Sequence, residues 1–243
     1  MDSVTVLDHG FVTLHNISGP TRRPNQLYGF GNGRPFDGDD TDPANAARMS
    51  FDQMNSGRTR EQDLKLAEYL MKNKHTTPFE MIEIWLEMKM PIFVARQFVR
   101  HRTVSINEVS ARYTTLPAEW YIPDVVGGKA PSAKQGQADT LDACTQSAFK
   151  AELQRLCVDS YTAYTDAIGL GVAPEHARMF LHLNHYTHWI WKQDLHNLMH
   201  FLSLRDHSHA QVEAQAYAKA IDKLIRQHLP NCMALYDTYR RMP

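Results

Sequence analysis

The sequence predicts an α+β fold, in which a mainly antiparallel sheet packs against long helices in a single domain spanning residues 1–243. Apolar and polar residues alternate over residues 81–90, which is typical of a half-buried strand. Apolar residues recur at helical spacing over residues 140–170. Helical segments predominate, and the few strands look antiparallel, which together favour the α+β class.

The first half of the chain contains four predicted elements and one long loop. Residues 3–18 are expected to form a strand or hairpin, and residues 19–43, rich in Gly, Pro and Asp, an inserted surface loop. An apolar stripe predicts a helix over residues 59–74, followed by the strand at 81–90. Pro91 suits the first turn of a further helix that runs to about His101.

The second half is mainly helical. The expected elements are a loop at 126–138, a long helix at 140–170, helices at 174–183, 195–204 and 209–228, and a short strand at 189–191. Seven residues of the long helix are expected to face the core: Phe149, Leu153, Leu156, Cys157, Tyr161, Tyr164 and Ile168. Gly169 and Gly171 are expected to end this helix.

Composition narrows the class of protein. With 43% apolar residues, 22% charged residues and a net charge of −1, the chain resembles an ordinary globular protein and lacks the basic excess of many nucleic-acid binders. Its three cysteines are widely spaced, which argues against a disulfide framework and fits a reducing compartment. Neither a secretory signal nor a membrane-spanning run is evident, so we expect a cytoplasmic protein without a membrane partner.

A cationic segment stands out between residues 96 and 113. Four arginines (Arg96, Arg100, Arg102 and Arg112) accompany a single acid, Glu108, and several hydroxyl and amide side chains. Guanidinium groups present paired donors that match phosphate oxygens. Because an apolar stretch leads directly into this segment, we interpret it as the wall of an anion-binding cleft rather than a solvated helix end.

These residues carry a family resemblance. Residues 100–105, RHRTVS, match the R-H-R-x-x-S signature of the flavin-dependent thymidylate synthases. Other blocks similar to this family occur in the same order over residues 45–225: 47–51, 75–80, 91–97, 107–113, 171–178 and 204–211. The resemblance implies reductive methylation of dUMP to dTMP, with methylenetetrahydrofolate as carbon donor and FAD, reduced by NADPH, as hydride carrier.

The resemblance also implies a nucleotide site. The residues expected to contact dUMP, through side chains or backbone, are Gln97, Phe98, Val99, Arg100, Glu108, Val109, Ser110, Ala111, Arg112, Arg178 and Arg205. Arg112 and Arg178 are expected to bind the phosphate. Arg205 is the expected catalytic residue, because a fixed cation at the uracil edge would favour the N3-deprotonated ring and direct electron density towards C5.

A flavin site shared between the subunits of a homotetramer is implied as well. The residues expected to contact FAD are Thr77, Arg100, His101, Arg102, Glu108, Asp194, Leu195, His196 and His200, with Ser50 and Glu80 as weaker candidates. The chain departs from the usual family pattern at several positions: Ala111 replaces a glycine, His182 a proline, Met81 a histidine, His196 an arginine and His200 an asparagine.

The cysteines are consistent with uracil methylation that uses a flavin rather than a protein thiolate. Methylation of uracil through a protein thiolate requires an activated cysteine beside cationic groups. Cys157 falls on the apolar stripe of the long helix, and neither Cys144 nor Cys232 has a cationic motif around it. For Ser110, hydrogen bonding is preferred over a nucleophilic role, because no base lies at an obvious spacing.

Two alternatives stay open at this point. Nine of the thirteen histidines lie between His176 and His228, and the i, i+4 pair His196 and His200 could bind a metal, as in a metal-dependent nucleotide hydrolase. The absence of an H-E-x-x-H pattern counts against it, and no metal is expected. The other alternative is a nucleic-acid binder that uses the arginines at 96–112, which the near-neutral charge disfavours.

Overall fold

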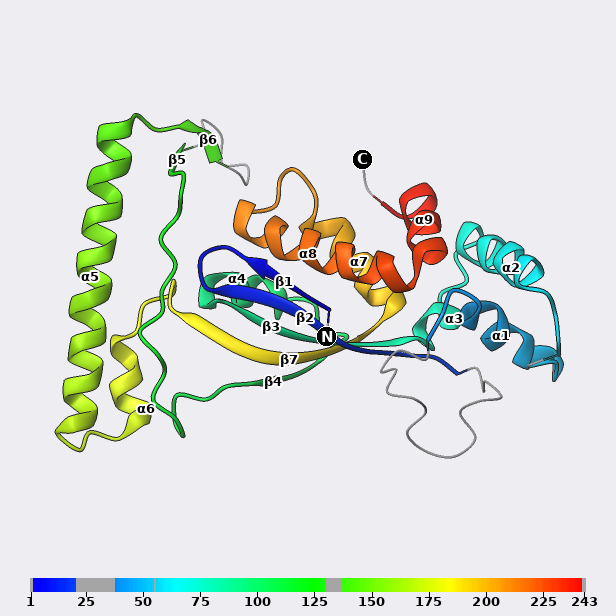
Figure 1. Cartoon of the computed structure of the whole chain (residues 1–243), viewed down its shortest axis with the longest axis horizontal. Helices are drawn as coiled ribbons and strands as arrows, with labels where there is room; N and C mark the ends of the chain where they lie inside the picture. Colours follow the sequence, from blue (N-terminus) through cyan, green and yellow to red (C-terminus); the bar gives the residue numbers. More distant parts are fainter. Residues whose placement is uncertain (1, 21–37, 55, 130–136, 242–243) are drawn as a thin grey trace.

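A five-stranded antiparallel sheet forms the centre of the computed structural model (Figure 1), which describes residues 2–20, 38–54, 56–129 and 137–241. The strand order is β1-β2-β3-β7-β4. The strands are β1 (Asp2–Val6), β2 (Gly10–Ser18), β3 (Glu83–Pro91), β4 (Ser105–Glu108) and β7 (Tyr186–Asp194). Strands β1 and β2 form the predicted N-terminal hairpin, and the alternation predicted at 81–90 is β3, whose Ile84, Leu86 and Met88 are buried.

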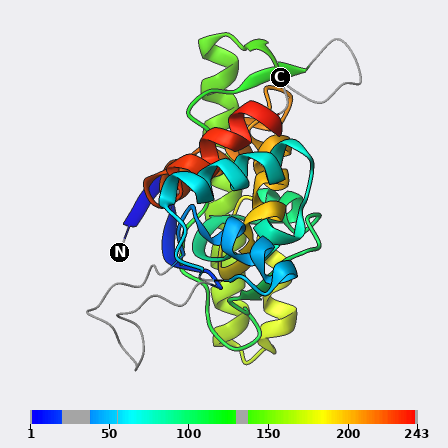
Figure 2. The same cartoon turned by 90° about the vertical axis from the view of Figure 1, so that its right-hand side faces the viewer.

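Helices cover one face of this sheet and close the main core. They are α4 (Ile92–Phe98), α7 (Leu195–Arg205), α8 (Val212–His228) and α9 (Pro230–Tyr239). Figures 1 and 2 show α7, α8 and α9 stacked above the sheet. Aromatic rings from both layers meet there: the centroid of Phe201 lies 4.8 Å from that of Phe98 and 5.1 Å from that of Trp191. Such edge-to-face contacts fix the ends of α4 and α7 relative to β7.

Three short or exposed helices form one end of the molecule: α1 (Asp42–Arg48), α2 (Arg60–Lys72) and α3 (Thr77–Glu80). Helix α2 matches the predicted helix, and Thr59 caps it through a reciprocal pair of bonds with Gln62. The predicted loop at 19–43 mostly lies outside the described residues, although its last two residues, Asp42 and Pro43, already belong to α1.

The long helix α5 (Ala143–Gly169) forms the opposite end of the molecule, beside α6 (Pro174–Ala177) and the 3-10 helix η3 (Arg178–Phe180). Gly171, at φ +84°, follows its last turn, as predicted. The core role predicted for its apolar stripe was only partly right. Cys157 and Tyr164 are buried, but Phe149 and Leu156 are exposed, because α5 contacts the rest of this chain along only part of its length.

Several predicted boundaries were wrong. Residues 126–138 include strand β5 (Gly127–Lys129) and the start of β6 (Gln137–Thr140), which pair as a small antiparallel sheet. The predicted helix at 174–183 ends after only two short turns. The strand expected at 189–191 is nine residues long, and Pro91 caps α4 rather than lying within it. No helix in the described part of the chain is long and apolar enough to cross a membrane.

Candidate active site

The cationic segment begins in the last turn of α4 and continues beyond the end of that helix. Val99 is the helix C-cap, and the His101 amide donates to the Phe98 carbonyl at 2.9 Å, which turns the chain out of the helix. The Phe98 side chain is fully buried in the main core, so it cannot contact a ligand. Arg100 and Arg102 are exposed on either side of the half-buried His101. The core thus anchors residues 100–102, a short segment in which both arginines face solvent.

Arg205, the last residue of α7, meets this segment. Its Nε donates to His101 Nε2 at 3.0 Å, and its Nη2 donates to the Gln97 carbonyl oxygen at 3.0 Å. The structure therefore brings Arg205 to Gln97 and His101, from which it is distant in the sequence. Gln97 is itself held from another helix, because its Nε2 donates to Oε1 of Gln211, the N-cap residue of α8, at 2.5 Å.

Burial and charge set the protonation of this group. Burial, with smaller contributions from Arg205 and His200, lowers the pKa of His101 to about 4, so the imidazole is neutral at pH 7 and its Nε2 accepts from Arg205. Burial also lowers the pKa of Arg205. In the described part of the chain no carboxylate pairs with Arg205, so its positive charge remains available to an anionic ligand.

The expected flavin residues at the start of α7 lie on a neighbouring part of the same helix. Asp194 is the N-cap, and its Oδ1 accepts from the Asn197 amide at 2.8 Å, whereas the Leu195 side chain is fully buried. His196 is half-buried, and burial lowers its pKa, with Glu80 acting in the opposite direction. His200 contacts His101, with 6.2 Å between ring centroids.

Two of the remaining flavin candidates lie on α3, which packs against α7. Thr77 is exposed at the start of α3, and Glu80, at its end, is close enough to His196 to affect its pKa. Ser50 lies in the exposed 3-10 helix η2 (Met49–Phe51).

Strand β4 presents the next set of nucleotide candidates at the sheet edge. Glu108 Oε1 accepts from Thr187 Oγ1 at 2.5 Å, and the Val109 amide donates to the His188 carbonyl at 2.8 Å. The chain then leaves the sheet in a turn, where the Arg112 amide donates to Ser110 Oγ at 3.3 Å and Ala111 is buried. No strand was expected over residues 105–108, and it is the pairing with β7 that makes the first part of this segment a strand.

Arg112 and Arg178 form a second cationic group. Arg112 Nε lies 3.3 Å from Oε2 of Glu175, in α6, and Arg178 follows in η3, where it is exposed. Figure 1 shows α6 beside α5 at one end of the molecule, well away from α7 above the sheet. Within one chain the structure thus places Arg205 against His101, and Arg112 against Glu175 in α6, three residues before Arg178, so the predicted residues fall into two groups rather than one.

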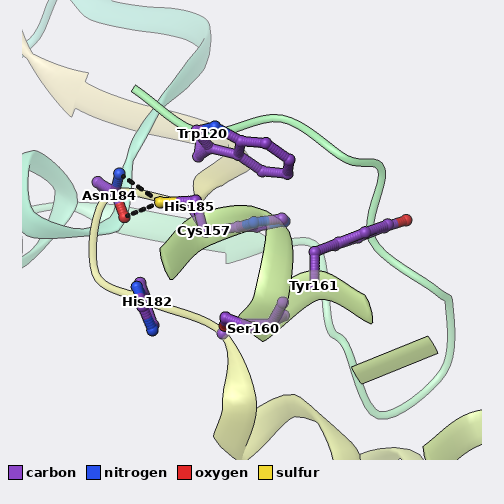
Figure 3. Close-up of a pocket in the computed structure, with 8 residues that line it drawn as sticks. Trp120, Cys157, Ser160, Tyr161, His182, Asn184 and His185 are labelled. Carbon is purple, nitrogen blue, oxygen red and sulfur yellow. Dashed lines mark hydrogen bonds between the residues drawn. The ribbon is translucent and has the colours of Figure 1, made fainter. Parts of the chain in front are cut away.

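Cys157, on α5, lies against a small cavity that none of the described arginines lines (Figure 3). This cavity has a volume of about 10 Å³, room for one water molecule, and is also lined by Trp120, Tyr161 and His185. Asn184 Nδ2 donates to Cys157 Sγ at 3.2 Å, and burial raises the pKa of the thiol. Burial also raises the pKa of the Cys232 thiol. Burial and a raised pKa both disfavour the thiolate form of these two cysteines.

The histidine-rich region does not converge on a metal site within the described residues. There, no group of three or more His, Cys, Asp or Glu side chains is arranged to hold a metal ion. His207 and His209 pack against each other with ring centroids 5.0 Å apart, and His188 Nε2 bonds Glu87 at 2.7 Å.

Comparison with known proteins decides the family. Residues 35–231 match the family model described as thymidylate synthase complementing protein. The chain is 40% identical over 240 residues to a flavin-dependent thymidylate synthase of Gluconobacter oxydans, covering 97% of this chain and 72% of that protein. It is 42% identical over 237 residues to the Thermus thermophilus enzyme of the same name, covering 98% and 79%.

The chain belongs to the flavin-dependent thymidylate synthase family. A solved structure agrees with this assignment. The UMP/dUMP methylase PolB from Streptomyces cacaoi, crystallised with 5-Br dUMP, superposes with a TM-score of 0.80 and 25% identity over 98% of this chain and 99% of that one. The predicted α+β class and the predicted family are both confirmed.

Three side chains that hold the candidate residues of this flavin-dependent thymidylate synthase were missed from the sequence: Gln211, Thr187 and Glu175. Each is a local partner of a predicted residue, but lies on an element distant in sequence. Gln211 and Glu175 were the easiest to predict, because each lies in one of the family-like blocks. Thr187 carries no chemical signal of its own, and its role emerges only from the pairing of β4 with β7.

Proposed function

We propose that this protein converts dUMP to dTMP as a flavin-dependent thymidylate synthase. The observation that carries the proposal is the setting of Arg205. It is a half-buried guanidinium without a carboxylate partner in the described part of the chain, held by a neutral histidine and a backbone carbonyl beside two exposed arginines. Such a group favours an anionic, planar ligand.

Arg205 would act on the pyrimidine. Its charge at the uracil edge would stabilise the N3-deprotonated ring and so increase electron density at C5, the carbon to be methylated. Gln97 would orient the base, and Arg112 and Arg178 would bind the phosphate. The backbone amides of Ser110 and Ala111 and the Glu108 carboxylate would complete the nucleotide site.

The residues present also fit a flavin. Arg100 and Arg102 are exposed cations suited to a diphosphate, and His101, held in its neutral form, offers a flat apolar surface. Thr77, Asp194, His196 and His200 would extend this surface along α3 and α7. FAD, when bound, supplies hydride-transfer chemistry with NADPH as reductant, and methylenetetrahydrofolate supplies the carbon.

The separation of the two cationic groups supports a site shared between subunits. Arg112 and Arg178 lie at the α5 end of the chain, and Arg205 lies above the sheet, so a second copy would bring its own arginines to complete the pocket. We therefore propose a homotetramer. We further propose that residues 1–243 form one domain with an insertion at 19–43, and that the protein is cytoplasmic, which its three free cysteines support.

One reconstitution tests the proposed function. Purified protein is incubated with FAD, NADPH, methylenetetrahydrofolate and dUMP, and dTMP is measured, with each component omitted in turn. We expect dTMP only in the complete mixture and a yellow protein free of stoichiometric metal. A colourless, metal-loaded protein that hydrolyses nucleotides would instead favour the hydrolase, and salt-sensitive polyanion binding without flavin would favour the nucleic-acid binder.

A further inference from the structure

The chain just beyond α9 contacts the end of α7, where Arg205 is the last residue. The Nη2 group of Arg241, two residues beyond α9, donates to Oδ2 of Asp206, the residue that follows Arg205 and caps the end of α7. Arg241 is itself held in place: its Nη1 donates to Asp237 Oδ1 at 2.9 Å, and its guanidinium lies 5.8 Å from the Tyr236 ring centroid.

Asp206 depends on this contact. Only 8% of its side chain is exposed, and its other carboxylate oxygen, Oδ1, is buried without a hydrogen-bond partner in the described part of the chain. A buried carboxylate is strongly destabilising once its cationic partner is removed, so the turn would rearrange to hydrate it. Arg241 is therefore the contact that allows Asp206 to stay buried next to Arg205.

We infer that Arg241 is a positioning residue, which holds the turn after α7 so that Arg205 can reach His101 and the Gln97 carbonyl. Pairing with Arg241 also neutralises the carboxylate adjacent to Arg205, which keeps the cation available to a ligand. The inference rests on the proposed function only for the identity of that ligand. The contact between Arg205 and His101 can be followed without one.

The neighbouring Arg226 provides a matched control. It joins α8 to α9 through Asp237 at 2.7 Å and bonds Asp222 of its own helix at 2.6 Å, and neither of these ion pairs involves Asp206. Loss of Arg226 should therefore weaken the packing of α9 without freeing the turn. Arg241→Met removes the cation from Asp206, whereas Arg241→Lys keeps it.

The experiment uses full-length, FAD-loaded protein of each variant. It measures the pKa of His101 by NMR of labelled histidine, the dUMP dissociation constant by calorimetry, and Tm. In Arg241→Met we expect the His101 pKa to rise by about one unit from its value near 4 and dUMP affinity to fall about tenfold, because Arg205 loses its fixed place. Arg241→Lys should retain most of both properties, and Arg226→Met should lower Tm while leaving both unchanged.

Two results would overturn the inference. One is an unchanged His101 titration in Arg241→Met, which would mean that Arg205 has not moved. The other is an equal loss in Arg226→Met at an equal fall in Tm, which would reduce the effect to general destabilisation. If wild-type protein binds no dUMP, the proposed function fails, and the His101 titration alone decides the role of Arg241.

Discussion

Two of the three donor nitrogens of Arg205 bond the protein, and the third is available to a ligand. Nε and Nη2 bond His101 and the Gln97 carbonyl, and Nη1 has no protein acceptor among the described residues. We predict that Arg205→Ala abolishes dTMP formation, a loss of at least about a hundredfold, while FAD remains bound. Turnover and flavin absorbance measure the two effects.

Arg155→Ala is the control for that substitution. Arg155 is an exposed arginine on α5 that pairs with Glu152 and Asp159, on a different element from Arg205 and its partners. It should retain normal turnover. Comparable dTMP formation by Arg205→Ala would remove Arg205 from its catalytic role.

Protonation of the buried His185 should make the free energy of unfolding depend on pH. Only 2% of its surface is exposed, Nε2 has no hydrogen-bond partner among the residues that the structure describes, and burial lowers its pKa to about 4. The unfolded chain, with a pKa near 6.5, binds the proton first, so stability should fall as pH drops from about 6.5 to 4. Between pH 7 and 5 this loss is about 2 kcal/mol.

His185→Phe should remove that part of the pH dependence, because a phenyl ring keeps the stacking on Tyr161 and cannot be protonated. Urea unfolding of both proteins at pH 7 and 5 measures the difference. His176→Gln, at an exposed position, is expected to keep the wild-type pH dependence. Equal slopes in wild type and His185→Phe would contradict the assignment.

At the scale of elements, α9 takes its N-terminal cap from a distant segment. The fully buried Asp40 accepts from the Cys232 amide at 2.8 Å, the Asn231 amide at 3.2 Å and Asn231 Nδ2 at 2.7 Å, whereas Leu229, the N-cap residue, supplies no side-chain bond. This carboxylate therefore satisfies the free amides of the helix and ties α9 to the segment before α1.

Asp40→Asn should destabilise the protein by about 2–4 kcal/mol, because it removes the charge and replaces one acceptor oxygen by a donor facing those amides. Thr59→Ala, which deletes the exposed local cap of α2, should cost only about 1 kcal/mol. Urea unfolding gives both values. A smaller effect at Asp40 than at Thr59 would contradict the role of the buried cap.

Local patterns predicted the elements that bury one face within the chain. The alternation in β3 and the stripe and cap of α2 are examples, since burial and periodicity agree there. Strand β4 was missed because it is a polar edge strand, and only its pairing with β7 makes it regular. In β7 the buried Thr187 and Gln193 hid most of the alternation, so only its tryptophan centre was predicted.

The candidate site, too, could be predicted from the sequence only in part. Motif spacing predicted the group around Arg100, His101 and Arg102, because these residues are contiguous. It also predicted Arg112, Arg178 and Arg205 individually. Which of them meet is set by contacts of the end of α7 with the end of α4 and of the turn after β4 with α6, and the spacing of residues along the chain contains no such information.

At the scale of the whole molecule, an apolar groove of about 560 Å³ lies where α5 ends, between it and η3. Leu170 and Met179 line it and are 85% and 75% exposed in the single chain. Such apolar exposure is typical of a protein interface. We predict that Leu170→Glu shifts the protein to smaller species in light scattering and strongly reduces dTMP formation.

Tyr69→Glu serves as the comparison, because Tyr69 is an exposed apolar residue on α2, at the other end of the molecule. It should leave the assembly intact. A Leu170→Glu protein that keeps the wild-type mass and activity would contradict an interface at this groove.

The separation of Arg178 and Arg205 within one chain implies that two inactive variants could complement each other in a mixed assembly. If each pocket draws these two arginines from different copies, Arg178→Ala and Arg205→Ala impair opposite halves of the same pocket. Two inactive proteins, unfolded and refolded together, would then regain part of the activity, since some hybrid assemblies contain a pocket with both arginines. Such complementation could not arise if every copy built its own pocket.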